Sequence, residues 1–156
     1  MSGVICTMAA LGETIVRLKR GGERGEERVV LWLARSVARD PATVIEVYEP
    51  DQICAVNYYK LPAESMRLLM EHLRAKRRKV VAQIHIHPGE AFHSEADAEW
   101  AIVRHVGALS LVLPHFAEHT TPSRFLDEVK TYEYTLERQW LLRPNRGDAA
   151  RVTVTP

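Results

Sequence analysis

The stretch 80–87 (VVAQIHIH) constrains the fold more than any other part of the chain. Its β-branched and apolar residues predict a buried strand, and the Pro88-Gly89 pair that follows stops the strand and turns the chain. Alternate side chains of a strand share one face, so His85 and His87 point the same way and the residue between them points into the opposite layer. The pattern predicts a strand that presents two imidazoles at its end.

Helix and strand patterns alternate along the rest of the chain. Apolar residues recur every three or four positions over 8–20 and again after Pro62, which predicts two amphipathic helices. The other predicted elements are strands at 28–38, 42–49, 53–59, 108–113 and 150–154, a helix at 94–104, and either a helix or a helix and a strand within 122–140. This mixed order predicts an α+β (α/β-like) fold in which helices sandwich a mixed sheet.

The composition is that of a globular protein. The chain has 156 residues, of which 46% are hydrophobic and 26% are charged. These values suit one domain over 1–156, with a core at about 8–140 and a polar C-terminal tail at 142–156. We find no repeat and no linker that would divide the chain.

Charge and cysteine content indicate the partners and the compartment. A formal net charge of +1 argues against a nucleic-acid surface. The basic run 74–79 (RAKRRK) is interpreted as the solvated end of the second helix. Cys6 and Cys54 are distant in sequence, which favours reduced, buried thiols over a disulfide framework. With no signal peptide and no apolar stretch of about 20 residues, we expect a cytoplasmic protein without a membrane partner.

The residues after the predicted strand can complete a metal site. Asp97 follows His87 by ten residues and adds a carboxylate to the two imidazoles. Catalytic zinc commonly takes three protein ligands and leaves a fourth position to water, although other divalent metals accept this donor set. We therefore predict His85, His87 and Asp97 as metal ligands, with zinc as the preferred ion.

The same residues also allow a purely structural interpretation. The run 94–97 (SEAD) matches the pattern of a helix N-terminal capping box, and the histidines could be polar residues at an exposed strand end. The two interpretations overlap, because the first turn of a helix can present metal ligands. His93, which precedes the capping pattern, is interpreted as a surface histidine; contact with a substrate and an alternative metal ligand are the other possibilities.

The runs 85–88 (HIHP) and 94–97 (SEAD) together resemble the JAMM motif of the JAB/MPN metalloprotease family. That family has an upstream glutamate, then H-x-H-P, then Ser-x-x-Asp. The family glutamate opens an early strand; Glu27 lies at that place here and Glu26 is the alternative. Two departures are visible: a valine and an alanine replace the usual glycines after the glutamate, and the loop between the second histidine and the serine is one residue shorter.

The resemblance implies a single JAB/MPN domain with a cytidine-deaminase-like mixed sheet. It further implies a zinc-dependent peptidase or isopeptidase that cuts after the C-terminus of a ubiquitin-like protein. In that family's mechanism Glu27 would act as the general base and Ser94 would donate a hydrogen bond to the oxyanion. Beyond the metal, no other cofactor is expected.

The resemblance also suggests partners. A ubiquitin-like protein or its conjugates would be the substrate, and activating and conjugating enzymes of a bacterial, antiphage pathway would accompany it. The chain lacks the long inserts of eukaryotic deubiquitinases, which favours a prokaryotic member that trims a precursor or removes a modifier. Two alternatives stay open: processing of a sulfur-carrier protein at the same site, and a non-catalytic MPN scaffold.

Overall fold

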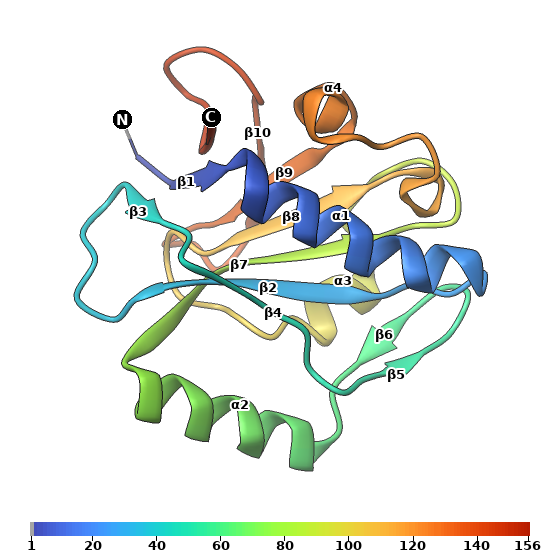
Figure 1. Cartoon of the computed structure of the whole chain (residues 1–156), viewed down its shortest axis with the longest axis horizontal. Coiled ribbons are helices and arrows are strands. Elements are labelled where there is room, and N and C mark those ends of the chain that lie inside the picture. The colour runs from blue at the N-terminus through green and yellow to red at the C-terminus, as the bar shows by residue number, and fades with distance from the viewer. Residues whose placement is uncertain (1) are drawn as a thin grey trace.

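A six-stranded mixed sheet forms the centre of the computed structural model, which describes residues 2–156 (Figure 1). The strand order is β10-β9-β8-β7-β2-β4. The strands are β2 (Val29–Arg35), β4 (Glu46–Tyr48), β7 (Arg78–Ile86), β8 (Leu109–Leu113), β9 (Lys130–Tyr134) and β10 (Trp140–Arg143). β7 and β8 run parallel, whereas the other neighbouring pairs are antiparallel. β2 and β7 lie inside the sheet because long apolar runs suit strands that are buried on both faces.

The two faces of this sheet carry different helices (Figure 1). Val30 and Trp32 of β2 belong to the core that includes α1 (Met8–Glu23), whereas Leu31 belongs to the core that includes α2 (Ala63–Lys76). Successive residues of a strand face opposite sides, so one continuous apolar run serves two cores. The predicted α+β fold, with a mixed sheet between helices, is confirmed.

A buried hydrogen bond fixes α1 against the sheet. The indole N–H of Trp32 donates to Thr14 Oγ1 at 2.8 Å, and the Thr14 hydroxyl donates to the carbonyl of Ala10 at 2.8 Å. Trp32 is fully buried, so its N–H needs a protein partner. The Trp32 ring also packs on Phe125 of α4 (Phe125–Glu128), with ring centroids 6.2 Å apart.

A second sheet joins the two ends of the chain. β1 (Val4–Thr7) lies between β11 (Val152–Thr155) and β3 (Ala42–Thr43), and both pairings are parallel. The predicted terminal strand is confirmed as β11. β1 is not expected from the sequence, because four residues give too short an alternation to stand out from the helix that follows.

The hydrophobic core is larger than the predicted range of 8–140. Val4 and Val152 are only 3% and 4% exposed, and they belong to the same cluster as Leu11 of α1. The tail at 142–156 therefore contributes a strand to the core and is not polar throughout.

Three predicted segments differ in detail from the structure. The strand expected at 42–49 is two short strands, β3 and β4. The strand expected at 53–59 is a hairpin of β5 (Ile53–Cys54) and β6 (Tyr59–Lys60). The segment 122–140 holds a 3-10 turn, α4 and β9, and its last residue begins β10, so the alternative with both helix and strand is correct.

The helix predicted at 94–104 is wrong in length. α3 covers only Glu95–Glu99. Beyond it, the backbone N–H of Ile102 donates to the side-chain oxygen of Gln83 at 2.9 Å, and Val103 is buried in the core on the α2 side. These tertiary contacts draw the chain away from the helical path, and a local capping pattern does not reveal them.

Both cysteines are free thiols. Cys6 is buried as predicted, whereas Cys54 is only half-buried. Burial raises the pKa of Cys6 to about 12, so this thiol stays protonated and unreactive. Within residues 2–156, no helix combines the length and the apolar character that crossing a bilayer requires.

Candidate metal centre

Two histidines lie close together at the end of β7, at one end of the sheet. His85 is fully buried within β7, and His87 follows the strand and is 3% exposed. Their Nε2 atoms lie 3.2 Å apart. Ile84 and Ile86 pack into the core on the α1 side. Because alternate side chains share a face, this register turns both imidazoles toward the opposite side of the sheet.

Asp97 reaches the same point from the first turn of α3. Its Oδ1 lies 3.2 Å from His85 Nε2 and its Oδ2 lies 3.1 Å from His87 Nε2. Ser94 is the N-cap of this helix, and it forms a capping box with Asp97. The capping interpretation and the ligand interpretation therefore hold together, because the turn that starts the helix also aims the carboxylate at the histidines.

Glu27 completes the cluster from the residues just before β2. This residue is 3% exposed, and its Oε2 lies 4.0 Å from His87 Nε2. Its backbone N–H donates to the carbonyl of Ala55 at 2.8 Å, which ties this residue to the β5–β6 hairpin. Of the two glutamates that the sequence left open, Glu27 lies in the cluster, and the half-buried Glu26 is not part of it.

These four side chains fit a divalent metal ion. One donor atom from each lies within 4.8 Å of all the others. Tetrahedral zinc with bonds of about 2.0–2.1 Å would hold its ligand atoms about 3.4 Å apart. The separations of 3.1–3.2 Å among His85, His87 and Asp97 are close to that spacing. Glu27 stands farther away, and its Oε1 is buried with no hydrogen-bond partner. A buried oxygen normally has such a partner, so this atom is suited to accept a hydrogen bond from a water molecule next to the ion.

Burial and mutual contacts set the charges of the three predicted ligands. Burial opposes ionisation of Asp97, but hydrogen bonds from His85 and His87 hold its pKa well below the usual range. Burial lowers the pKa of His85, which favours the neutral imidazole that metals bind. Burial also acts to lower the pKa of His87, yet its hydrogen bond and charge interaction with Asp97 outweigh this and raise the pKa.

Glu27 has the protonation behaviour of a group that can exchange protons near neutral pH. Burial raises its pKa to about 7, with a smaller opposing effect from His87. Perturbed carboxyl groups of this kind are typical of active sites. A pKa close to the working pH is also the property that an efficient general base needs.

A narrow groove of about 130 Å³ opens onto the cluster. It is lined by Glu27, by Asn57 from the β5–β6 turn, and by six residues of the segment after β7, namely His87, Pro88, Gly89, Glu90, Phe92 and Ser94. Phe92 is 54% exposed, and its ring stands edge-on to His87 at a centroid distance of 4.8 Å. Asn57 and Phe92 are not predicted from the sequence, because neither belongs to a local motif and only the tertiary fold brings them to the groove.

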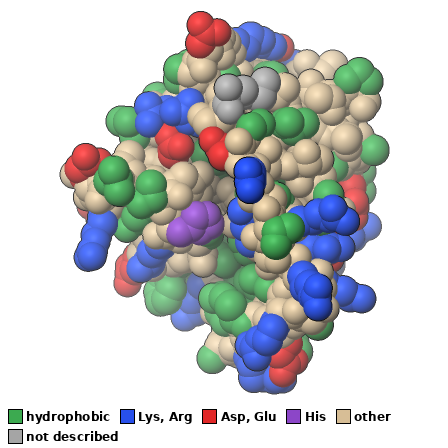
Figure 2. Space-filling model, turned by 90° about the vertical axis from the view of Figure 1, so that its left-hand side faces the viewer, with side chains coloured by type: hydrophobic (Ala, Val, Ile, Leu, Met, Phe, Trp, Pro, Cys, Tyr) green, Lys and Arg blue, Asp and Glu red, His purple; other side chains and the backbone are tan. Residues whose placement is uncertain are grey.

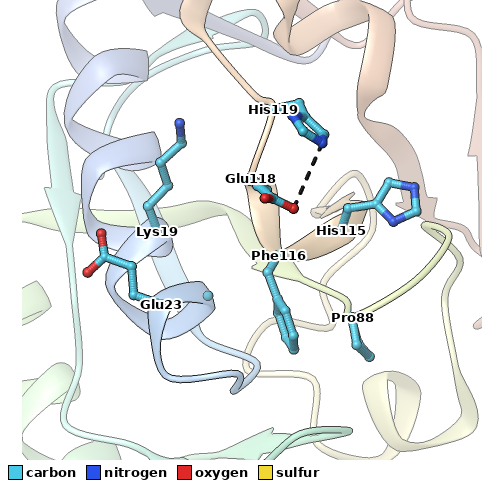
Figure 3. Close-up of a pocket in the computed structure, with 8 residues that line it drawn as sticks. Lys19, Glu23, Pro88, His115, Phe116, Glu118 and His119 are labelled. Atoms are coloured by element: carbon cyan, nitrogen blue, oxygen red, sulfur yellow. Dashed lines mark ion pairs between the residues drawn. The ribbon is translucent and has the colours of Figure 1, made fainter.

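A larger cavity of about 720 Å³ adjoins this groove, and Pro88 lines both (Figure 3). Lys19 and Glu23 line the cavity from α1. Glu118 and His119 line it from the chain after β8, where their side chains form an ion pair at 3.8 Å. The cavity has room for several peptide residues beside the metal-binding cluster.

The turn after β8 supports the backbone of the metal-binding loop. Its three residues, η1 (His115–Ala117), have positive φ values of 51°, 52° and 57°, a strained conformation for residues other than glycine. The N–H of His115 donates to the carbonyl of Gly89 at 2.8 Å, and the N–H of Phe116 donates to the carbonyl of His87 at 2.7 Å. These bonds hold the backbone on which the second histidine is mounted.

His93 is half-buried, which corrects its interpretation as a surface histidine. Its ring packs against Tyr132 and Trp140, with centroid distances of 5.2 and 5.0 Å. Burial lowers its pKa to about 4, so the ring is neutral at physiological pH. The contact anchors the loop that leads to Ser94 on β9 and β10.

Comparisons with known proteins show a sequence relative that is named a metalloprotease and a solved structure with a similar fold. No protein-family model matches the chain. The chain is similar to the probable metalloprotease y4jG of Sinorhizobium fredii (strain NBRC 101917 / NGR234), with 31% identity over 147 residues, which cover 88% of this chain and 85% of that protein. The solution structure of protein DSY2949 from Desulfitobacterium hafniense is similar with a TM-score of 0.70 and 12% identity, covering 97% of this chain and 92% of that one. The second likeness concerns the fold alone.

Proposed function

The chain belongs to the family of this probable metalloprotease, and on that premise we propose that it is a zinc-dependent peptidase of the JAMM type. The proposed reaction is hydrolysis of the peptide or isopeptide bond that follows the C-terminal residue of a ubiquitin-like protein. Trimming of a precursor and removal of a conjugated modifier both use this reaction. A bacterial conjugation pathway, with antiphage defence as one such setting, is the proposed context.

The observation that carries the proposal is the convergence of His85, His87 and Asp97, with Glu27 beside them. Burying two imidazoles and two carboxylates at one point costs stability that apolar side chains would not cost. An arrangement of this kind is typical of sites where chemistry requires it. A non-catalytic scaffold would have no need to keep all four of these buried side chains together.

In the proposed mechanism His85, His87 and Asp97 would hold a zinc ion, and the bound ion would supply Lewis acidity toward a water and a carbonyl. Glu27 accepts the proton of the attacking water and then gives it to the departing amine. Its pKa of about 7 before metal binding shows that burial makes this carboxylate a better proton acceptor than an exposed glutamate. Its position beside the ligands, and not among them, leaves its oxygens free for this transfer.

Ser94 can serve the reaction without giving up its structural role. Its Oγ accepts the backbone N–H of Asp97 at 3.1 Å, which uses a lone pair of the hydroxyl. The hydroxyl hydrogen stays available for donation. Ser94 also lines the groove, so we propose that it donates to the oxyanion that forms when water adds to the carbonyl.

The shape of the groove supports a substrate with small residues at the bond that is cut. Phe92 and Asn57 wall a volume of only about 130 Å³, and glycine is the residue that fits such a space most readily. The Gly-Gly terminus of ubiquitin-like proteins meets this requirement. The adjoining cavity of about 720 Å³ offers a place for residues on the other side of the bond. Processing of a sulfur-carrier protein would use the same terminus and the same groove.

The test is cleavage of fusion proteins in which candidate ubiquitin-like proteins that end in Gly-Gly are joined to a reporter. We expect zinc-loaded protein to cut at the junction, chelator to stop cleavage, and added zinc to restore it. A second fusion in which bulky residues replace Gly-Gly is expected to resist cleavage. Mass spectrometry of the products identifies the bond that is cut.

Two charge-matched variants separate catalysis from metal binding. Glu27→Gln is expected to slow cleavage by at least about 10²-fold while the protein keeps its zinc, because the general base is lost and the ligands remain. Glu26→Gln removes the neighbouring charge outside the cluster and is expected to cut as the wild type does. Wild-type turnover by Glu27→Gln, or a wild-type protein without bound metal, would overturn the proposal.

A further inference from the structure

A recess collects arginine side chains at the end of the sheet that lies away from the metal centre. We call it the arginine recess. Its volume is about 580 Å³, and its lining consists of Arg35, Ala38, Arg39, Pro41, Thr43, Ile45 and Arg78. β7 begins at Arg78 and carries His85 seven residues later, so the two sites are roughly 20 Å apart along the strand.

Two segments of the chain bring these side chains together. Arg35 is the last residue of β2, and it is paired with Arg78 directly across the antiparallel ladder. The ammonium group of Lys79 donates to the carbonyl of Ala38 at 2.7 Å. The loop between β2 and β3 is thereby tied to the start of β7, and the basic residues of both segments share one surface.

The positive charges of the recess are poorly balanced by acidic side chains. Arg35 and Arg78 are directly opposite each other in the ladder, and like charges in this arrangement are destabilising. The acidic neighbour of Arg78 is Glu46, at 3.5 Å, but Glu46 also bonds His72 at 2.7 Å. Arg35 and Arg39 are both exposed, and neither forms an ion pair with any residue in 2–156.

The basic run 74–79 extends this surface. It is interpreted from the sequence as a solvated helix end, but the structure sets it beside the arginines of a different segment. Figure 2 shows this side of the molecule, where Lys and Arg side chains gather over its right and lower parts. Because the whole chain carries a formal net charge of only +1, the remainder of the molecule is negative on balance. The charge of this surface is therefore a local feature and does not reflect a basic protein.

We propose that the arginine recess binds a small, multiply charged anion whose chemical class is a diphosphate or an organic polyphosphate. Guanidinium groups bind phosphate oxygens in bidentate fashion, and three of them line one recess. The volume lies within the range of about 300–1,000 Å³ that is typical of small-molecule sites. Pro41 and Ile45 offer an apolar wall for the organic part of such a ligand. The site is separate from the metal centre, and its existence does not depend on the proposed peptidase activity.

Calorimetric titration of the zinc-loaded protein with sodium diphosphate tests this binding. The recess variant is Arg35→Gln/Arg39→Gln, and the matched control is Arg20→Gln/Arg138→Gln, which removes two exposed arginines that lie outside the recess. We expect the recess variant to bind at least about tenfold more weakly, because charge-assisted hydrogen bonds to the anion are lost. We expect the control to bind as the wild type does. Chelator-treated protein is expected to give the wild-type affinity.

Mapping of amide chemical shifts by NMR on the wild type needs no variant and locates the anion directly. The shifts are expected at 35–43 and 76–79. Shifts confined to 85–97 would place diphosphate at the metal centre and would overturn the proposal, as would equal weakening by both double variants. A third arm uses a short single-stranded oligonucleotide. If the oligonucleotide binds at the recess and diphosphate does not bind at all, the recess is a nucleic-acid-binding surface and the proposed small-anion site is wrong.

Discussion

Ser94 and Asp97 hydrogen-bond to each other twice. The N–H of Ser94 donates to Asp97 Oδ2 at 2.8 Å, and the N–H of Asp97 donates to Ser94 Oγ at 3.1 Å. The same Oδ2 atom lies 3.1 Å from Nε2 of His87. One turn of backbone therefore caps α3 and also orients a predicted metal ligand, so stability and the proposed chemistry are coupled at this pair.

Substitution of Ser94 by alanine should expose both roles. Loss of the cap is expected to lower the free energy of unfolding by about 1 kcal/mol. Loss of the hydroxyl donor is expected to lower kcat by about 10²–10³-fold. Urea unfolding gives the first quantity, and steady-state kinetics on a cleavable fusion gives the second.

Ser94→Thr is the matched control for this prediction. Threonine keeps both the acceptor for the N–H of Asp97 and the hydroxyl hydrogen. We expect it to retain most of the stability and most of the activity. An alanine variant that unfolds more easily and yet cuts at the wild-type rate would remove Ser94 from the proposed mechanism.

Glu27 should make the stability of the metal-free protein depend on pH. Its pKa is about 7 in the folded protein and about 4.3 in an unfolded chain. The folded carboxyl binds its proton more tightly, so its stabilising contribution is complete below about pH 4 and is lost as the pH rises through about 7. A shift of this size corresponds to about 4 kcal/mol at most. Urea unfolding in chelator across this pH range measures the effect.

Glu27→Gln isolates this contribution, because it removes the titrating group and keeps the size of the side chain. We expect the free energy of unfolding of the variant, relative to the wild type, to increase as the pH rises from about 5 to about 8. Zinc should weaken this dependence, since a nearby cation favours the ionised carboxylate. A difference between the two proteins that stays constant with pH contradicts the assignment.

Much of the candidate site could be predicted from the sequence because its signals are local. His85 and His87 are two residues apart, and a single strand therefore places them on one face. Ser94 and Asp97 are three residues apart, and a single helix start therefore brings them into contact. Glu27 was harder to predict. Two adjacent glutamates precede β2, and the choice between them depends on contacts with the β5–β6 hairpin.

The features that the sequence did not predict depend on distant contacts. α3 ends early because Ile102 is bonded to Gln83 of β7, and β1 forms because the chain ends pair with each other. Phe92 reaches the groove, and Arg35 reaches the arginine recess, only when the loops and strands that carry them come together. Periodicity within a single element contains no information on such placements.

The hydrogen bond between Trp32 and Thr14 should make a measurable contribution to stability. Thr14→Val removes the acceptor and leaves a buried indole N–H without a partner, which is expected to cost about 1–3 kcal/mol. Val16 is 57% exposed on the same helix, and Val16→Thr is expected to change stability by no more than about 0.5 kcal/mol. Urea unfolding compares the two variants. Equal stabilities would show that this bond does not fix α1 on the sheet.

Anomalous diffraction from crystals grown with zinc tests most directly whether His85, His87 and Asp97 hold one metal ion. We predict a single strong peak about 2.0–2.2 Å from both Nε2 atoms and from a carboxylate oxygen of Asp97, with Glu27 beside it and not bound. Absence of a peak among these residues, with the imidazoles turned away from one another, would contradict the metal centre and the proposed peptidase together.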